Sequence, residues 1–258
     1  MSATFRTRLR KGEPLLGTFL RTPSFIAAEV MARSGLDVIC VDTEHAPFGR
    51  VETDACVATL RAHHMPSLVR VIAGTPEHIL AALDSGATGV LVPHVTSAAQ
   101  AREIAKAAHF GPGGRGYAGS SRAAGFTTKP MGQHLSDSAR DTTVIIQIED
   151  LEAVDAVDEI ATVDGIDALF IGRMDLTVAL CASSPADAKV LEAVRRICRA
   201  GKSAGRAVGM FVANVSEVPM WLTEGAGFFL MSSDHGLMLT GAKSLAATFA
   251  DARAKAGV

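Results

Sequence analysis

The chain has little of several features that would each point to a particular class of protein. Of its 258 residues only 5% are aromatic, with one tryptophan and one tyrosine, and its net charge is −2. A charge so close to zero gives no electrostatic reason to expect a nucleic acid or an anionic membrane surface as partner. We therefore expect neither, and look to small molecules instead.

Cysteine is also scarce, and its spacing is uninformative for metal binding. The four cysteines are Cys40, Cys56, Cys181 and Cys198; they form no C-x-x-C pair and lie in apolar strand or helix contexts. This pattern favours reduced, buried thiols over a zinc site or a disulfide framework.

Long hydrophobic runs are missing as well. No apolar run reaches the roughly 18 residues of a membrane-spanning helix. Residues 1–11 are polar and basic and lack the apolar segment of a signal peptide. These absences predict a cytoplasmic protein.

What the chain does contain is a regular alternation of apolar strands and helices. We expect strands at 15–20, 37–41, 67–71, 89–93, 143–148, 168–171, 207–212 and 228–231. The helices expected between and after them cover 24–34, 51–64, 76–85, 97–108, 151–161, a stretch ending near 204, 218–224 and 237–254. Eight such units predict one closed (β/α)₈ barrel, a TIM barrel, over residues 1–258; a doubly wound sheet is the alternative.

Glycines are expected to end several of these helices. Gly35, Gly86, Gly165 and Gly205 each follow a predicted helix, where a left-handed residue commonly stands.

One segment interrupts the alternation. Residues 110–135 are rich in glycine and arginine and too long for an ordinary connection. They lack the strand–glycine–helix order of a phosphate site. We expect an ordered lid or a contact between subunits, with phosphate binding as the alternative.

The most informative feature is the position of the charges that follow the apolar strands. Asp42, Arg70 and Glu149 each close a strand, and Asp175 follows another closely. The carboxyl ends of parallel strands meet at one edge, where such folds build their sites. Glu149 and Asp175 offer hard oxygen ligands suited to Mg²⁺, Mn²⁺ or Co²⁺. The alternative is two solvated acids at helix starts.

Arg70 and His45 have the chemistry to act beside such an ion. A guanidinium in an apolar barrel mouth needs an anion; Arg70 could pair with an acid or face the oxyanion of a substrate. His45, just beyond the second strand, can carry a proton near neutral pH. Asp42 or Glu44 could orient it, or only hold the loop together. His94 and His235, after the fourth and eighth strands, are weaker candidates for lining the mouth.

Lysine is missing where one mechanism would need it. A Schiff-base aldolase requires a lysine in the barrel mouth, and no predicted strand end carries one. A carbon–carbon lyase built on this chain would use a metal and no organic cofactor.

Several segments together resemble the HpcH/HpaI aldolase family. They are Asp42–Pro47 (D-T-E-H-A-P), Val69–Val71, Leu83–Pro93, Gly114–Gly116, Gln147–Glu149 and Gly172–Leu176. The segments recur in order from the first predicted unit to the sixth, so the resemblance covers nearly the whole chain.

The resemblance implies a divalent-metal pyruvate aldolase that cleaves or forms 4-hydroxy-2-oxo acids. Glu149 and Asp175 would hold the ion, Gln147 would lie beside the keto acid, and backbone amides from Gly172 to Asp175 would receive its carboxylate. Arg70 would stabilise the enolate oxygen, and His45 would move the proton. Arg173 and Met174 stand where many relatives have proline or alanine. Phe19, with Phe211 and Val212, would border the substrate.

The resemblance also implies a hexamer, a trimer of dimers with exchanged C-terminal helices. Asp84 ends a helix before the fourth strand, at the opposite face of its own barrel. It could therefore support His45 only in a neighbouring subunit. Two other functions stay open: an acyl-thioester lyase like the citrate lyase β-subunit, and a catalytically silent barrel that serves as a binding or scaffold protein.

Overall fold

The computed structural model describes residues 3–256, whose strands close into one barrel. Residues 1, 2, 257 and 258 of the predicted domain lie outside the described residues. The strands are β1 (Leu15–Leu20), β2 (Val38–Asp42), β3 (Ser67–Arg70), β4 (Gly89–Val92), β5 (Thr143–Ile148), β6 (Ala168–Ile171), β7 (Ala207–Val212) and β8 (Phe228–Ser233). Each pairs in parallel with the next, and β1 pairs with β8 to complete the circle. The predicted (β/α)₈ barrel is thus confirmed.

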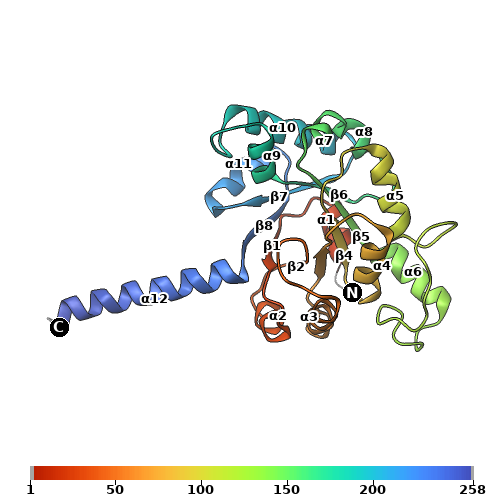
Figure 1. Ribbon diagram of the computed structural model, residues 1–258, viewed down its shortest axis with the longest axis horizontal. Coiled ribbons are helices and arrows are strands. Elements are labelled where there is room, and N and C mark those ends of the chain that lie inside the picture. The colour runs from red at the N-terminus through yellow and green to blue at the C-terminus, as the bar shows by residue number, and fades with distance from the viewer. Residues whose placement is uncertain (1–2, 257–258) are drawn as a thin grey trace.

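Helices surround these strands (Figure 1). They are α1 (Phe5–Arg10), α2 (Phe25–Ala32), α3 (Arg50–Ala62), α4 (Pro76–Asp84), α5 (Ala98–Ala108), α6 (Met131–Asp141), α7 (Leu151–Asp155), α8 (Val157–Ala161), α9 (Arg173–Ala179), α10 (Ala188–Ser203), the 3₁₀ turn η1 (Val215–Glu217), α11 (Val218–Thr223) and α12 (Asp234–Ala256).

Two buried layers follow from the alternation of side chains along each strand. One layer fills the barrel and includes Phe19, Leu91 and Phe170. The other lies between strands and helices and includes Ile146 and Val212. Because both faces of every strand are buried, the strands are almost continuously apolar.

Helix α1 closes the amino-terminal end of the barrel and was not expected from the sequence. Phe5 packs edge-on against Phe228, with ring centroids 5.9 Å apart. Arg6 donates from Nε to Asp167 at 2.8 Å. Helix α1 therefore covers the amino ends of the strands at the centre of the barrel.

Other expectations need correction. The helix predicted over 151–161 is two short helices, α7 and α8. The end of the supposed loop 110–135 is the start of α6. Cys181 is exposed, in a turn after α9, whereas the other three cysteines are buried as expected. The glycine caps are confirmed: Gly86 and Gly165, for example, have φ of 92° and 89°.

Helix α12 extends away from the barrel as a long projecting rod (Figure 1). Asp234 is the only buried residue of its 23, all of which are described. Its carboxylate accepts hydrogen bonds from the backbone N–H groups of Arg21 and Thr22, which fixes the first turn to the end of β1. Beyond that turn the apolar residues are exposed, including Leu245 at 73% and Phe249 at 65%. Among residues 3–256, no helix has both the length and the apolar character needed to cross a membrane.

Candidate active site

A cavity of about 380 Å³, here called the mouth cavity, lies at the carboxyl ends of the strands. In barrels of this kind, active sites form at this face. Predicted site residues that line it are Phe19, Asp42, His45, Arg70, Gln147, Gly172, Arg173, Met174 and Asp175. The strand-end charges therefore converge as the sequence predicted.

Asp42 and Arg70 form a buried, two-pronged ion pair between adjacent strands. Arg70 donates from Nε and an Nη to the two Asp42 oxygens at 3.0 and 2.8 Å. Burial raises the pKa of Asp42, but the hydrogen bonds and charge of Arg70 outweigh it, so that pKa lies below its ordinary value. Burial lowers the pKa of Arg70, but pairing with Asp42 raises it above the ordinary value. Both groups are therefore held in their charged forms.

The same Asp42 carboxylate organises the loop that carries His45. Its Oδ1 accepts a hydrogen bond from the His45 backbone N–H at 3.1 Å, and Arg21 Nε lies 3.2 Å from Oδ2. The His45 ring is instead nearest Glu44, with Nε2 3.7 Å from Oε2. Of the two acids considered for orienting the ring, Glu44 is therefore the one positioned to do so, while Asp42 supports the backbone.

Glu149 lies beneath the mouth cavity with 3% of its surface exposed. Gln147 donates to Oε2 of Glu149, and the His94 backbone N–H donates to Oε1 at 3.0 Å. Gly172 makes this position possible, because a Cβ there would come within 2.5 Å of Glu149 Oε2. The glycine in Gly172–Leu176 is thus required by the close approach of the carboxylate.

The electrostatic environment of Glu149 lacks a strong cationic partner. Burial raises the pKa of Glu149, hydrogen bonds from Gln147 and His94 lower it, and the nearby charge of Asp175 raises it further. The net shift is upward. Two carboxylates with so little compensation are well suited to share a cation.

The donor set fits a divalent metal ion. Within residues 3–256, the buried Gln147 Oε1 has no hydrogen-bond partner; Glu44 Oε2 has none either, although Arg70 Nε lies 3.3 Å from it. Such oxygens are costly to bury unless something binds them. The ligand atoms of His94, Glu149 and Asp150 lie within 4.8 Å of one another. Asp175, predicted as the second ligand, is exposed at the rim of the same cavity.

His94 was only a minor candidate from the sequence, but it lies in the centre of this acidic group. Its Nδ1 is 3.2 Å from Asp150 Oδ2 and 3.4 Å from Glu149 Oε1. Burial lowers the pKa of His94, but the hydrogen bond to Asp150 and the charges of Glu149, Asp150 and Glu44 raise it overall. The available signal was its position directly after the fourth strand; nothing marked Asp150.

Arg173 is held by the loop after β7. It donates to Glu217 at 2.6 Å, and its guanidinium carbon lies 5.7 Å from the centre of the Trp221 ring. Burial raises the pKa of Glu217, but Arg173 lowers it overall. Met174 beside it is 55% exposed. Arg173 thus joins two loops, while Met174 presents an apolar side chain to the mouth.

The aromatic border of the mouth is partly as expected. Phe19 packs against Phe211, with ring centroids 6.3 Å apart, and Arg70 lies 4.5 Å over the Phe19 ring. Val212, also predicted to border the substrate, is fully buried in the layer under the helices. That prediction is wrong because successive strand residues face opposite sides; Phe211 has the inward position.

Asp84 does not line the mouth cavity of its own barrel. It accepts a hydrogen bond from Arg115 of the glycine-rich segment at 2.5 Å. It also borders a cavity of about 880 Å³ beside α3 and α4, here called the lateral groove. Residues lining the groove include Thr43, Phe48, Val51, Ile72 and Ser121.

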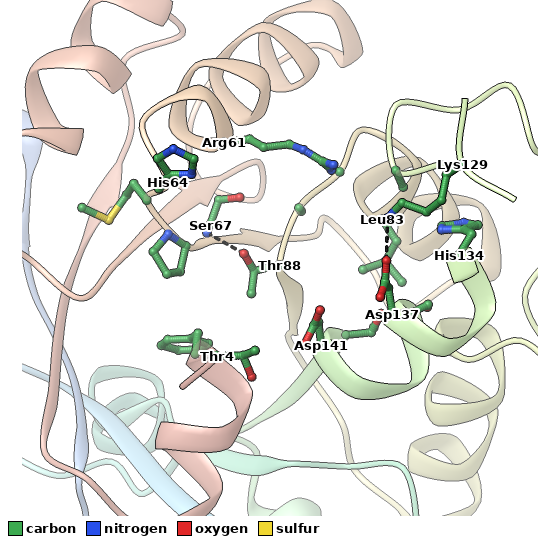
Figure 2. A pocket seen from close by; sticks show the side chains of 18 of the residues that line it. Thr4, Arg61, His64, Ser67, Leu83, Thr88, Lys129, His134, Asp137 and Asp141 are labelled. Atoms are coloured by element: carbon green, nitrogen blue, oxygen red, sulfur yellow. Dashed lines mark hydrogen bonds and ion pairs between the residues drawn. The ribbon is translucent and has the colours of Figure 1, made fainter. Parts of the chain in front are cut away.

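A further cavity, of about 490 Å³, lies at the other end of the barrel (Figure 2). Ser67 and Thr88 near the amino ends of β3 and β4 border it, joined by a hydrogen bond of 3.1 Å. Its Lys129 is already paired with Asp137 at 2.8 Å. Its position opposite the carboxyl ends separates it from the converging charges of the mouth.

A closed parallel barrel with acids and an arginine converging at its mouth belongs to the class of (β/α)₈-barrel enzymes. Comparison with known proteins narrows this class. The family model described as HpcH/HpaI aldolase/citrate lyase matches residues 15–240. The chain therefore belongs to the HpcH/HpaI family, and it is a carbon–carbon lyase.

Individual relatives support the assignment to this family. A hydroxypyruvate/pyruvate aldolase of Roseovarius nubinhibens is 32% identical over 90% of both chains. A 4-hydroxy-2-oxo-heptane-1,7-dioate aldolase of Salmonella typhimurium is 32% identical over 96% of this chain and 95% of the relative. The crystal structure of a family protein from Burkholderia cenocepacia superposes with a TM-score of 0.88, at 32% identity, over 95% of this chain and 98% of that one.

Proposed function

We propose that the chain is a divalent-metal-dependent aldolase that cleaves 4-hydroxy-2-oxo acids to pyruvate, or a related 2-oxo acid, and an aldehyde, or runs the reverse reaction. The observation that carries this proposal is that Gln147, whose buried oxygen has no hydrogen-bond partner, lines one cavity with the Asp42–Arg70 pair while its amide group donates to buried Glu149. The names of the two aldolase relatives support the same substrate class.

Glu149 and Asp175 would hold the ion, chosen from Mg²⁺, Mn²⁺ and Co²⁺ on the basis of their hard oxygen donors. When bound, it supplies Lewis-acid withdrawal of electrons from the keto acid. The unpaired N–H groups at the start of α9, after Gly172, are suited to receive the substrate carboxylate. Gln147 keeps an amide oxygen free beside this position.

In the cleavage direction, His45 takes the proton from the C4 hydroxyl while the C3–C4 bond breaks. The aldehyde leaves, and the electron pair of the broken bond passes to pyruvate as its enolate. Arg70, kept charged by Asp42, stabilises the enolate oxygen. A proton then adds to C3 of the enolate and gives pyruvate. Phe19, Phe211 and Met174 border the side of the cavity left for the aldehyde.

The metal requirement is tested by chelation. Exhaustive treatment with EDTA should lower the rate of pyruvate release about 10³-fold, because the ion contributes several kcal/mol of transition-state stabilisation. Added Mn²⁺ or Co²⁺ should restore the rate. The measurement is a coupled pyruvate assay across a panel of 4-hydroxy-2-oxo acids. Borohydride with pyruvate should leave the protein mass unchanged, since no imine forms; full activity after chelation would contradict the proposal.

A second copy of the chain is part of the proposal. The exposed apolar residues of α12 and the lateral groove are the kind of unpaired surface that association covers. We propose a homo-oligomer, a hexamer with exchanged C-terminal helices, in which Asp84 supports a neighbour's His45. A cytoplasmic location also stays a prediction.

Complementation between subunits tests this arrangement. His45→Ala and Asp84→Asn chains should each be nearly inactive alone. Oligomers that contain both should regain part of the activity, because one chain contributes His45 and the other contributes Asp84 to an intact site. The assay is pyruvate release after co-expression, with unmixed variants as controls. Mixed oligomers with no gain in activity would exclude support of His45 by Asp84 in trans.

A further inference from the structure

The backbone at His94 is unusual for a residue with a side chain. Its φ of 53° lies in the left-handed region, which residues other than glycine adopt uncommonly, asparagine, aspartate and histidine more often than the rest. In this conformation its N–H meets Glu149 Oε1 at 3.0 Å. Strained backbone of this kind is maintained mainly where surrounding contacts and function require it. The left-handed turn therefore places the His94 backbone directly against Glu149.

The imidazole has the spacing of a metal ligand relative to its acidic neighbours. Nδ1 lies 3.4 Å from Glu149 Oε1 and 3.2 Å from Asp150 Oδ2. Adjacent ligand atoms around an octahedral ion with bonds of about 2.1 Å are about 3 Å apart. Nδ1 and the Glu149 oxygen can therefore bind the same ion with little rearrangement.

The other ring nitrogen faces a carboxylate that lacks a full set of partners. His94 Nε2 is 3.8 Å from Glu44 Oε1. The Glu44 side chain is 10% exposed; Arg70 Nε lies 3.3 Å from its Oε2, and among residues 3–256 that oxygen accepts no hydrogen bond. Histidines that bind metals usually donate their second N–H to a carboxylate, which fixes the ring. Glu44 is placed to do this for His94.

An ordinary ion pair would explain these contacts less well. The His94 side chain is 61% exposed, and exposed pairs contribute little stability. Glu44 is also contacted by Arg70, but the two carboxylates of Glu149 and Asp150 still outnumber the single charge of a protonated His94 ring.

We propose that His94 is a nitrogen ligand of the divalent ion held by Glu149, with Glu44 orienting the ring from its other side. This inference rests on the proposed metal-dependent function. An imidazole ligand favours Mn²⁺, Co²⁺ and Ni²⁺ over Mg²⁺, which prefers oxygen. His94 thereby sets the metal preference of this chain.

Pulsed EPR of the Mn²⁺-loaded full-length protein tests the proposal directly. The wild type should show histidine ¹⁴N coupling to Mn²⁺, which should change to the ¹⁵N pattern when histidine is labelled. The coupling should vanish in His94→Asn, a variant whose asparagine tolerates the left-handed backbone. It should persist in the matched control His63→Asn, a change at the residue that caps the C-terminal end of α3. Absence of coupling in the wild type, or its persistence in His94→Asn, overturns the proposal.

Metal affinity gives an independent measurement. By titration calorimetry, His94→Asn should bind Co²⁺ about 10- to 100-fold more weakly, the range for disturbed metal sites. Mg²⁺ affinity should change far less. An equal loss for both ions overturns the nitrogen-ligand role. If His94→Asn takes up no Mn²⁺, the coupling must persist in His45→Asn, which changes the histidine that lines the mouth cavity; its loss there overturns the proposal.

The two proposals fail in different ways. Histidine coupling without pyruvate release from any 4-hydroxy-2-oxo acid would refute the proposed function and leave the ligand intact. Metal-dependent pyruvate release without histidine coupling would refute the role of His94 and leave the function intact.

Discussion

Replacing Glu149 with glutamine is expected to lower the catalytic efficiency of pyruvate release at least ~1,000-fold. The amide keeps the shape of the side chain but loses the charge that binds the ion. It also places an NH₂ group where Gln147 and the His94 backbone donate hydrogen bonds. Steady-state kinetics at saturating Mn²⁺ measures the first effect, and titration calorimetry measures the loss of Mn²⁺ affinity.

The same variant should change the stability of the metal-free protein only slightly. Burial and the charge of Asp175 raise the pKa of Glu149, so removing the unfavourable ionised carboxylate offsets the hydrogen bond lost where the amide NH₂ faces a donor. We therefore expect the metal-free Glu149→Gln protein to melt within a few degrees of the wild type. Glu152→Gln, an exposed change on α7, is the matched control. Retention of a tenth or more of the activity by Glu149→Gln would exclude Glu149 as an essential ligand.

The barrel could be predicted from the sequence because each strand is buried on both faces and therefore reads as an apolar run. Helix α6 could not, since only His134 and Ser138 of its residues are buried and no apolar period marks it. Helix α1 has only six residues, which is too short to show a helical pattern of apolar residues. Helices that seal an end or rim of the barrel bury too little apolar surface to show in the pattern.

Within the site, the sequence indicated which charges meet but not how they pair. Asp42, Arg70 and Glu149 end their strands, so topology alone brings them together. Whether Asp42 supports the His45 ring or its backbone depends on side-chain conformations that packing determines. The left-handed turn at His94 likewise has no mark in the sequence, because only a small fraction of histidines adopt this conformation.

The position of α12 shows a further limit of prediction from the sequence. The sequence predicted a helix over 237–254, and the structure has one from Asp234 to Ala256. Its apolar residues, such as Leu239 and Phe249, are exposed in this chain. A hydrophobic pattern reveals that a surface will be covered, but not whether the same chain or another copy covers it.

Arg70→Met is expected to lower both activity and stability. Losing the guanidinium at the enolate oxygen should cost about 10²–10³ in kcat, as for other donors of this kind. Breaking the buried pair leaves Asp42 charged without its main partner, at a cost of about 3 kcal/mol. Arg21, 3.2 Å from Asp42, keeps the cost at the lower end of the usual range. Methionine keeps an unbranched apolar side chain next to Phe19, so the main change is the loss of the guanidinium charge, which lies 4.5 Å over that ring.

The sign of the pH effect makes this prediction specific. Arg70 holds the pKa of Asp42 in the folded protein below its ordinary value. The ion pair therefore stabilises the wild type fully above the unfolded-state pKa of about 3.9, and this stabilisation is lost as the pH falls through the folded-state pKa. In Arg70→Met, the unpaired Asp42 becomes less costly as it protonates. The difference in Tm between the two proteins should therefore be large at pH 7 and shrink below about pH 4.

A double variant separates the lost pair from lost packing. Asp42→Leu with Arg70→Met removes both charges, and such replacements of buried pairs are often neutral in stability. It should be more stable than Arg70→Met alone, yet equally inactive, because the group that stabilises the enolate is missing from both. Calorimetric melting and pyruvate release measure the two properties. A double variant less stable than the single one would show that Asp42 contributes chiefly through its bonds to the His45 loop rather than through Arg70.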